Sequence, residues 1–353
     1  MTRSVFIAVD IVGNAMRTSL LPYVASSTMH GDMEIVTHAP PPRVIVVCGP
    51  TGIGKTRTAI HLAQQFNGEI IGADSMQIYR HMDIGTAKPT PDERSRVRHH
   101  MVDIIDPETP YDAACYAQDA GDAVRALHER GLVPVVAGGT GLYIKALIHG
   151  LFNSQPPDPD IRRNLEQLAD AQGTAHLHEQ LTICDPHAAA GIHVNDRFRI
   201  IRALETYQTT GHPISAHQRQ HRFAQPRFAT FKIGLTMPRA ELYARIDQRV
   251  DQMVAEGLLE EVRGLLARGY GADLKSMQSI GYRHMVDFLQ SRVVWEETLR
   301  LLKRDTRRYA KRQFTWFRAD PDIEWITPDE LESLQPAIKS FLTTGPPVMT
   351  MTS

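Results

Sequence analysis

Residues 44–56 read VIVVCGPTGIGKT, and this stretch decides the fold. Val44 to Cys48 is a short run of apolar, mostly β-branched residues, which is typical of a strand buried on both faces. The next eight residues match the pattern G-x-x-x-x-G-K-[ST] in full. From Thr56 to Phe66, apolar residues recur at helical spacing. A strand, a glycine-rich turn and a helix in this order predict a phosphate-binding loop (P-loop).

The chemistry of such a loop follows from its residue types. Glycines let several main-chain N–H groups surround one phosphate group, and the helix N-terminus adds partial positive charge. Lys55 would neutralise phosphate oxygens, and the hydroxyl of Thr56 would ligate Mg²⁺. The candidate phosphate-binding residues are Gly49, Pro50, Thr51, Gly52, Ile53, Gly54, Lys55 and Thr56.

Further strands extend the pattern. Glu69 to Ala73 reads as a second strand that ends at Asp74, and a helix follows from about Ala113 to Arg130. Val133 to Ala137 reads as a third strand that runs into Gly138-Gly139-Thr140-Gly141. This alternation predicts an α/β fold with a P-loop-containing parallel sheet core, in which ligands collect at the carboxyl ends of the strands. We therefore expect Asp74 to lie beside the P-loop.

The remaining segments suggest a division into domains. Pro156-Pro157-Asp158-Pro159 breaks the α/β pattern, and the sequence reads helical from Ile161 to about Gly211 before a returning strand at Phe231 to Leu235. We expect a disordered N-terminal extension at 1–42, a core at 43–150 and 227–340, a helical insertion domain at 151–226 and a flexible tail at 341–353.

Charge is distributed unevenly over a chain whose formal net charge is only −1. Residues 300–318 hold eight Lys or Arg and one acidic residue, Asp305, so this segment carries +7 and the remainder −8. A concentrated basic segment on a mildly acidic body suggests a polyanionic partner. The three cysteines lie far apart and fit no zinc or redox spacing, which favours reduced thiols and a cytoplasmic location. No apolar run approaches the length of a membrane span, so we expect no membrane partner.

Four residues are candidates for the reaction centre. Asp74 at a strand end can accept a proton from a nucleophile, although a helix cap or a ligand of Mg²⁺-bound water is an equal alternative. Thr140 lies in a glycine-flanked turn that either meets a substrate or is a simple turn. Arg245 and Arg249 are four residues apart on one helix and share a face, which either clamps a phosphate group or faces solvent.

The basic segment is also a candidate binding surface. Between Arg304 and Arg318 it mixes basic residues with four aromatic ones. On a helix, Arg308 and Arg312 share a stripe with Arg304 and Lys311, which suits the phosphate backbone of a nucleic acid. A solubilising surface is the alternative.

Several motifs in one order resemble the tRNA dimethylallyltransferase family, also called tRNA isopentenyltransferases. The resemblance spans roughly Val44 to Trp325. It is carried by GPTGIGKT at 49–56, ADSMQIYR at 73–80, MDIGTAKP at 82–89, HH at 99–100, GGTGLY at 138–143, NDRFRIIRALE at 195–205, QSIGYR at 278–283 and KRQFTWFR at 311–318.

This resemblance implies a reaction and roles for individual residues. The donor would be dimethylallyl pyrophosphate, the acceptor N6 of the tRNA adenosine adjacent to the 3′ side of the anticodon, and the cofactor Mg²⁺. Asp74 would be the base, Thr140 would lie near the reacting centre, and one arginine of the Arg245/Arg249 pair would contact pyrophosphate, with Arg249 preferred. A further set would contact tRNA: Ser75, Met76, Gln77, Arg162, Phe198, Arg199, Ile200, Ile201, Arg202, Gln278, Ser279, Ile280, Gly281, Tyr282 and Arg283. We expect a monomer.

Two other enzymatic functions compete with this hypothesis, and a third alternative, a non-catalytic RNA-binding module, leaves the full P-loop unexplained. One is prenylation of free adenine nucleotides, although a small acceptor needs neither a helical insertion nor a basic stripe. The other is a small-molecule kinase, although no acidic residue ends the strand Val133 to Ala137 and no Asn-Lys-x-Asp motif is present. The prenyltransferase hypothesis requires one cavity that joins Asp74 to the loop at 49–56.

Overall fold

A single parallel sheet organises the chain, for which a computed structural model describes residues 40–150, 158–221 and 226–344. Its six strands run in the order β3-β2-β4-β1-β5-β6, and all pairings are parallel. The predicted α/β sheet core with a P-loop is confirmed. The strands are β1 (Arg43–Cys48), β2 (Gly68–Gly72), β3 (His99–His100), β4 (Val133–Gly138), β5 (Ala229–Leu235) and β6 (Ile323–Ile326).

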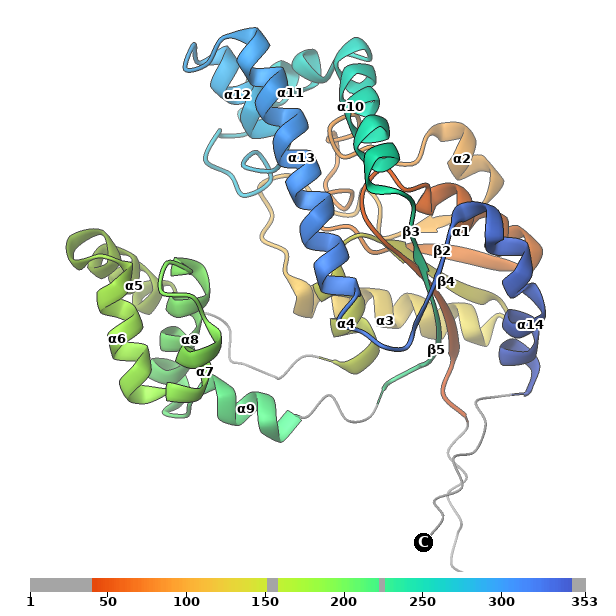
Figure 1. Cartoon of the computed structure of the whole chain (residues 1–353), viewed down its shortest axis with the longest axis horizontal. Coiled ribbons are helices and arrows are strands. Elements are labelled where there is room, and N and C mark those ends of the chain that lie inside the picture. The colour runs from red at the N-terminus through yellow and green to blue at the C-terminus, as the bar shows by residue number, and fades with distance from the viewer. Residues whose placement is uncertain (1–39, 151–157, 222–225, 345–353) are drawn as a thin grey trace, which may run out of the picture. The chain divides into compact units, whose positions relative to one another are not determined.

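Helices cover both faces of this sheet, with α1 (Lys55–Gln65) and α14 (Gln335–Thr344) on one face and α3 (Ala113–Glu129) and α4 (Gly141–His149) on the other (Figure 1). Alternate residues of β1 belong to different hydrophobic clusters. Ile45 and Val47 pack with α1, whereas Val44 and Val46 pack with α3 and α4. Burial on both faces explains why β1 is apolar throughout.

The strand order sets the positions of three loops at the carboxyl edge of the sheet. β4 lies between β1 and β2, so the turn after β4 is the one next to the P-loop. Asp74, at the end of β2, therefore lies at the same edge as the P-loop, as expected, but one strand away from β1. Thr140 occupies the intermediate place, and its N–H donates to the carbonyl of Ala73 at 3.1 Å.

Four helices from the C-terminal half complete this edge. In Figure 1, α10 (Arg239–Ala255) and α13 (Trp295–Phe317) extend beyond the carboxyl edge of the sheet together with α11 (Leu258–Ala267) and α12 (Tyr282–Leu289). Nearly all of the basic segment 300–318 lies in α13, which ends at Phe317. The short helix α2 (Pro91–Arg96) and the 3₁₀ helix η1 (Pro328–Leu334) lie in connecting segments.

The segment between the two internal gaps is entirely helical and has its own hydrophobic cluster, which includes Leu165, Leu177, Leu181, Ile200 and Leu204. Whether it acts as a separate insertion domain stays a prediction. Its helices are α5 (Pro159–Gln172), α6 (Thr174–Cys184), α7 (Pro186–Gly191), α8 (Arg197–Thr210) and α9 (Ile214–His221).

The terminal predictions are only partly covered by the structure. Of the expected extension at 1–42, only 40–42 are described. The expected tail at 341–353 begins too early, because 341–344 belong to α14. Ile338 is fully buried and Leu342, one turn later, packs on the same cluster, so the apolar face of the helix continues past residue 340. Across the described ranges, every helix is too short or too polar to cross a lipid bilayer.

Candidate active site

The P-loop adopts the conformation that its glycines permit. Gly52 and Gly54 have φ values of 82° and 103°, in the left-handed region that disfavours a side chain. Gly54 is also the N-cap residue of α1, so the loop turns directly into the helix. The ammonium of Lys55 folds back and donates to the carbonyl of Pro50 at 2.8 Å. This leaves the loop closed around the position that an anion occupies in such loops.

One cavity of about 730 Å³ joins the P-loop to the end of β2. Of the predicted phosphate-binding residues, Gly49, Pro50 and Ile53 lie outside its lining, and Ile53 is fully buried. The predicted residues that line it are Thr51, Gly52, Gly54, Lys55, Thr56, Asp74, Ser75, Met76, Gln77, Arg245, Arg249, Ser279, Ile280 and Gly281. The arrangement that the prenyltransferase hypothesis requires is thus present.

Asp74 is held by the turn that it begins. Its Oδ1 accepts from the N–H of Met76 at 2.9 Å and, at a longer 3.4 Å, from that of Gln77. Both bonds use the same oxygen, and among the described residues none hydrogen-bonds Oδ2, so Oδ2 is the atom available to a proton from a ligand in the cavity. A fixed carboxylate with one committed and one available oxygen is suited to general-base chemistry.

Thr140 does not line the cavity but supports the turn that carries Asp74. Its Oγ1 accepts from the N–H of Ser75 at 3.0 Å. Tyr309 of α13 faces this hydroxyl, and burial raises the pKa of Tyr309 well above its usual range. Thr140 therefore joins the ends of β2 and β4 beside α13.

Gln313 links the same helix to the P-loop, and the sequence did not single it out. Its Nε2 donates to the carbonyl of Gly139 at 2.9 Å, and its Oε1 accepts from the N–H of Thr51 at 2.9 Å. Leu302, Thr306, Tyr309 and Gln313 all line the cavity at helical spacing. That uncharged stripe is the signal that could have located Gln313, which the concentration of basic residues obscured.

Three charged groups interact across the cavity. Removal from water lowers the pKa of Lys55 to about 8, an effect that the charge of Asp74 opposes and that of Arg249 reinforces. Burial also lowers the pKa of Arg249, again opposed by Asp74. A carboxylate thus faces two partly desolvated cations, whose charge is available to a bound anion.

The structure distinguishes the two arginines of α10. Arg249 reaches the P-loop, with its Nη1 3.5 Å from Thr51 Oγ1. Arg245 is exposed, and its Nη2 lies 2.9 Å from the carboxylate of Glu241 one turn earlier. Both line the cavity, but only Arg249 approaches the loop.

A metal ion would have few protein ligands here. Thr56 lies in the cavity wall at the start of α1. Within the described ranges, no three His, Cys, Asp or Glu side chains gather closely enough to hold an ion. A hydroxyl combined with phosphate oxygens and water is a common coordination of Mg²⁺, so the donor set fits that ion when a phosphate group is bound.

The expected tRNA-contacting residues of the core differ in accessibility. Ser75, Met76, Gln77, Ser279, Ile280 and Gly281 line the cavity, whereas Gln278 is exposed on the surface. Arg283 donates to Asp305 at 2.7 Å. Tyr282 is completely buried, so its side chain cannot meet RNA.

The expected tRNA-contacting residues on α5 and α8 also include both exposed and buried side chains. Phe198 is 70% exposed and lies under the guanidinium of Arg162, and Arg199 is also exposed. Ile200 and Ile201 are buried in the cluster of the helical segment. Arg162 and Arg202 bind the same buried carboxylate of Glu205, at 3.2 and 2.8 Å.

The basic stripe of α13 is partly neutralised by ion pairs. Lys303 binds Asp251, Arg307 binds Asp247, and Arg304 binds Asp305. Exposed cations continue the stripe toward the C-terminal end of the helix at Arg308, Lys311 and Arg312. With Trp316, these three residues line a second cavity of about 1070 Å³. The surface that can attract a polyanion is therefore smaller than the net charge of the segment suggests.

A family model described as IPP transferase matches residues 77–320, which is more than half of the chain. The chain belongs to the IPP transferase family. The match begins at Gln77 in the Asp74 turn and extends beyond the end of α13. It therefore includes both helices that close the cavity, together with α5 to α9.

Curated relatives in the IPP transferase family are similar over most of their length. The tRNA dimethylallyltransferase of Desulfosudis oleivorans is 55% identical, over 86% of this chain and 97% of the relative. That of Syntrophobacter fumaroxidans is 54% identical, over 80% of this chain and 83% of the relative.

Solved structures have the same fold. A tRNA isopentenylpyrophosphate transferase from Bacillus halodurans is 42% identical with a TM-score of 0.64, covering 85% of this chain and 97% of that chain. A eukaryotic dimethylallyltransferase acting on tRNA is 29% identical with a TM-score of 0.73, covering 86% of this chain and 80% of that one.

Proposed function

We propose that the chain is a tRNA dimethylallyltransferase. It transfers the dimethylallyl group from dimethylallyl pyrophosphate to N6 of the adenosine adjacent to the 3′ side of the anticodon. The observation that carries this proposal is the single cavity lined by the P-loop, Arg249 and Asp74. The names of the relatives and solved structures support the same activity.

The leaving group is stabilised on the P-loop side. In the reaction, the allylic C–O bond to pyrophosphate breaks, and negative charge develops on the departing oxygens. Main-chain N–H groups of the loop, Lys55 and Arg249 surround that charge in a site of restricted water access, where such groups act strongly. Mg²⁺ held through Thr56 would neutralise further charge on the pyrophosphate.

The nucleophile is handled on the Asp74 side. Adenine N6 is a weak nucleophile, because its lone pair is delocalised into the ring. As the C–N bond forms, N6 loses a proton, and Oδ2 of Asp74 accepts it. Thr140 orients the reaction indirectly, since its hydroxyl holds the N–H of Ser75 next to the base.

The acceptor has to leave its stacked position to enter a cavity, so we expect the target base to flip. The cavity-lining turn Ser75 to Gln77 and the segment Ser279 to Gly281 would surround the adenosine. Arg308 and Arg312 would contact the phosphate backbone, together with Phe198 and Arg199 of the helical segment.

The proposal is tested by incubating the protein with radiolabelled donor and either tRNA or AMP, followed by mass spectrometry of the nucleosides. We expect N6-dimethylallyladenosine in tRNA and no labelled AMP. Label on AMP alone would indicate an enzyme for free nucleotides. ATP-dependent phosphorylation of a small molecule without transfer from the donor would indicate a kinase.

A further inference from the structure

A loop at residues 82–87 forms part of the cavity wall and is hydrogen-bonded to the turn that carries Asp74. Gly85, Thr86 and Ala87 line the cavity. The carbonyls of Thr86 and Ala87 both accept from Nε2 of Gln77, each at 3.1 Å. Because the N–H of Gln77 also faces Oδ1 of Asp74, the position of this loop affects the position of the carboxylate.

A carboxylate from a distant helix holds this loop. Oε2 of Glu261, in the first turn of α11, accepts from the N–H groups of Asp83 at 2.9 Å and Ile84 at 2.8 Å. Its Oε1 accepts from the N–H of Gly85 at 3.1 Å. Three successive amides thus converge on one anion, which is a strong, charge-assisted arrangement.

Tyr282 of α12 also binds this carboxylate, and we call Glu261 and Tyr282 together the clamp. The hydroxyl of Tyr282 donates to Oε1 of Glu261 at 2.6 Å, and its ring lies directly against Gly85. A side chain at Gly85 would place its Cβ 2.5 Å from that ring, so the close approach requires glycine there. Burial raises the pKa of Tyr282 well above its ordinary value, which keeps the hydroxyl protonated as a donor.

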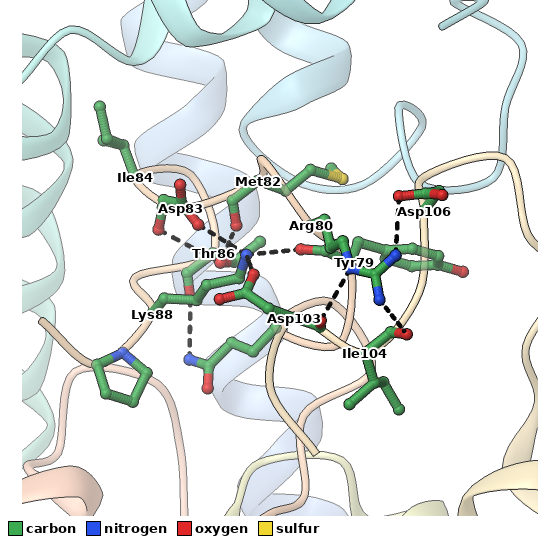
Figure 2. A network of polar contacts seen from close by, with 12 residues as sticks. Tyr79, Arg80, Met82, Asp83, Ile84, Thr86, Lys88, Asp103, Ile104 and Asp106 are labelled. Carbon is green, nitrogen blue, oxygen red and sulfur yellow. Dashed lines mark hydrogen bonds and ion pairs between the residues drawn. The ribbon is translucent and has the colours of Figure 1, made fainter. Parts of the chain in front are cut away.

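A second set of contacts, made by Lys88 directly after the loop, also holds Asp83 and is shown in Figure 2. The ammonium of Lys88 is buried and donates to the carbonyl of Tyr79 at 2.6 Å and to Asp83 at 2.7 Å. It also pairs with Asp103. This anchor uses residues from the same segment of the chain, whereas Glu261 reaches across 178 residues.

We infer that Glu261, supported by Tyr282, is a positioning residue for the transfer reaction. It fixes the 82–87 loop and, through Gln77, the orientation of Asp74. The inference rests on the proposed function, in which Asp74 is the base. Glu261 does not line the cavity, so its loss leaves the P-loop grip on the donor intact while misplacing the carboxylate that receives the proton.

The test is Glu261→Gln, which preserves size but replaces one accepting oxygen by an amide nitrogen that faces N–H donors. The matched control is Glu260→Gln, since the neighbouring carboxylate is exposed and binds only Arg263 among the described residues. We expect the single-turnover rate with saturating tRNA to fall about ten- to a hundredfold in Glu261→Gln, because a displacement of a catalytic group by about 1 Å can lower a rate by about this much. Donor affinity, measured by calorimetry, should change less than twofold in both variants.

A double-mutant cycle with Gln77→Ala tests the route of the effect. If Glu261 acts through Gln77, the double variant loses little more than the more damaging single variant, so the losses are not additive. Additive losses, an unchanged rate in Glu261→Gln, or a loss of donor affinity as large as the loss of rate would each overturn the inference. If Glu261→Gln does not fold, Tyr282→Phe replaces it in the cycle, with an expected three- to tenfold loss of rate.

Hydrogen exchange separates this inference from the proposed function. If the wild-type protein transfers no label to tRNA, the proposed function is wrong. Amide hydrogen exchange then tests by itself whether Glu261 holds the loop. Faster exchange of the amides of residues 83–85 in Glu261→Gln than in Glu260→Gln supports the clamp. Equal exchange in the two variants contradicts it, whatever the reaction proves to be.

Discussion

Two walls of the cavity are built in different ways. One wall consists of loops at the carboxyl ends of β1, β4 and β2, where main-chain amides and short side chains define the site. The other wall consists of long side chains from α10 and α13, including Arg249, Tyr309 and Gln313. The strand-end wall places groups through the backbone, whereas the helical wall depends on side chains held by packing and ion pairs. Substitutions in the strand-end wall should therefore lower the rate of transfer most. Substitutions in the helical wall should have smaller effects on the rate and should also affect stability and tRNA binding.

The largest effect is expected at Asp74 on the strand-end wall. Asp74→Asn keeps the shape of the turn but removes the proton acceptor, so the transfer rate should fall by roughly two to four orders of magnitude. Affinity for tRNA and donor should be largely kept. Rapid-quench measurement of transfer at saturating substrates checks this. A near-normal rate would remove Asp74 from the role of base.

The next effect distinguishes two arginines on the helical wall. Arg249→Ala removes a partly buried cation beside Thr51 and should lower kcat by about 10²- to 10³-fold, as for the loss of other charge-stabilising donors. Arg245→Ala removes an exposed residue paired with Glu241 and should cost less than about threefold. Steady-state kinetics of the two variants side by side checks the contrast. Equal losses would mean that both arginines hold pyrophosphate.

A smaller effect concerns the stability of the helical wall. The guanidinium of Arg304, helped by Arg283 and His284, lowers the pKa of Asp305 from 3.8 to about 2. Because the folded state lowers this pKa, the stabilisation is present in full above pH 3.8 and is lost as the pH falls to about 2.

Urea unfolding of wild type and Asp305→Asn between pH 6 and pH 2.5 measures that contribution. The stability of the wild type should decline more steeply below pH 4 than that of the variant. Parallel curves would show that folding does not lower the pKa of Asp305.

The smallest effect is expected on the surface of α13. Arg308→Ala combined with Arg312→Ala should weaken tRNA binding about tenfold and reduce the slope of log K against log salt by roughly 1.4 to 1.8. Arg300→Ala, which removes an exposed cation paired with Glu297 on the same helix, is the control. Filter binding over a range of salt concentrations measures both. An unchanged slope in the double variant would identify the stripe as a solubilising surface.

The difference between the walls also explains what the sequence could predict. Asp74, Thr140 and the P-loop follow buried strands, and a parallel sheet brings such positions to one edge whatever the details of packing. The order of the strands was not predictable in the same way, so the place of β4 between β1 and β2 had to come from the structure.

The helical wall was predicted less completely for a physical reason. Gln313 in this wall, like Glu261 outside the cavity, binds main-chain groups far away along the chain, 262 and 178 residues distant respectively, and a main-chain N–H leaves no mark in the sequence. The choice between Arg245 and Arg249 stayed open because both lie on one helical face. Likewise, the ion pairs of Lys303 and Arg307 with α10 reduce the basic stripe in a way that spacing along α13 could not reveal.

The central claim is that one cavity holds the pyrophosphate and the base together. A crystal structure of the protein with tRNA and the unreactive thio analogue of dimethylallyl pyrophosphate tests it most directly. We predict the diphosphate on the amides of residues 52–56 with Arg249 against it, and adenine N6 within hydrogen-bond distance of Asp74 Oδ2. A diphosphate bound away from this loop, or an adenine whose N6 faces away from Asp74, would contradict the account.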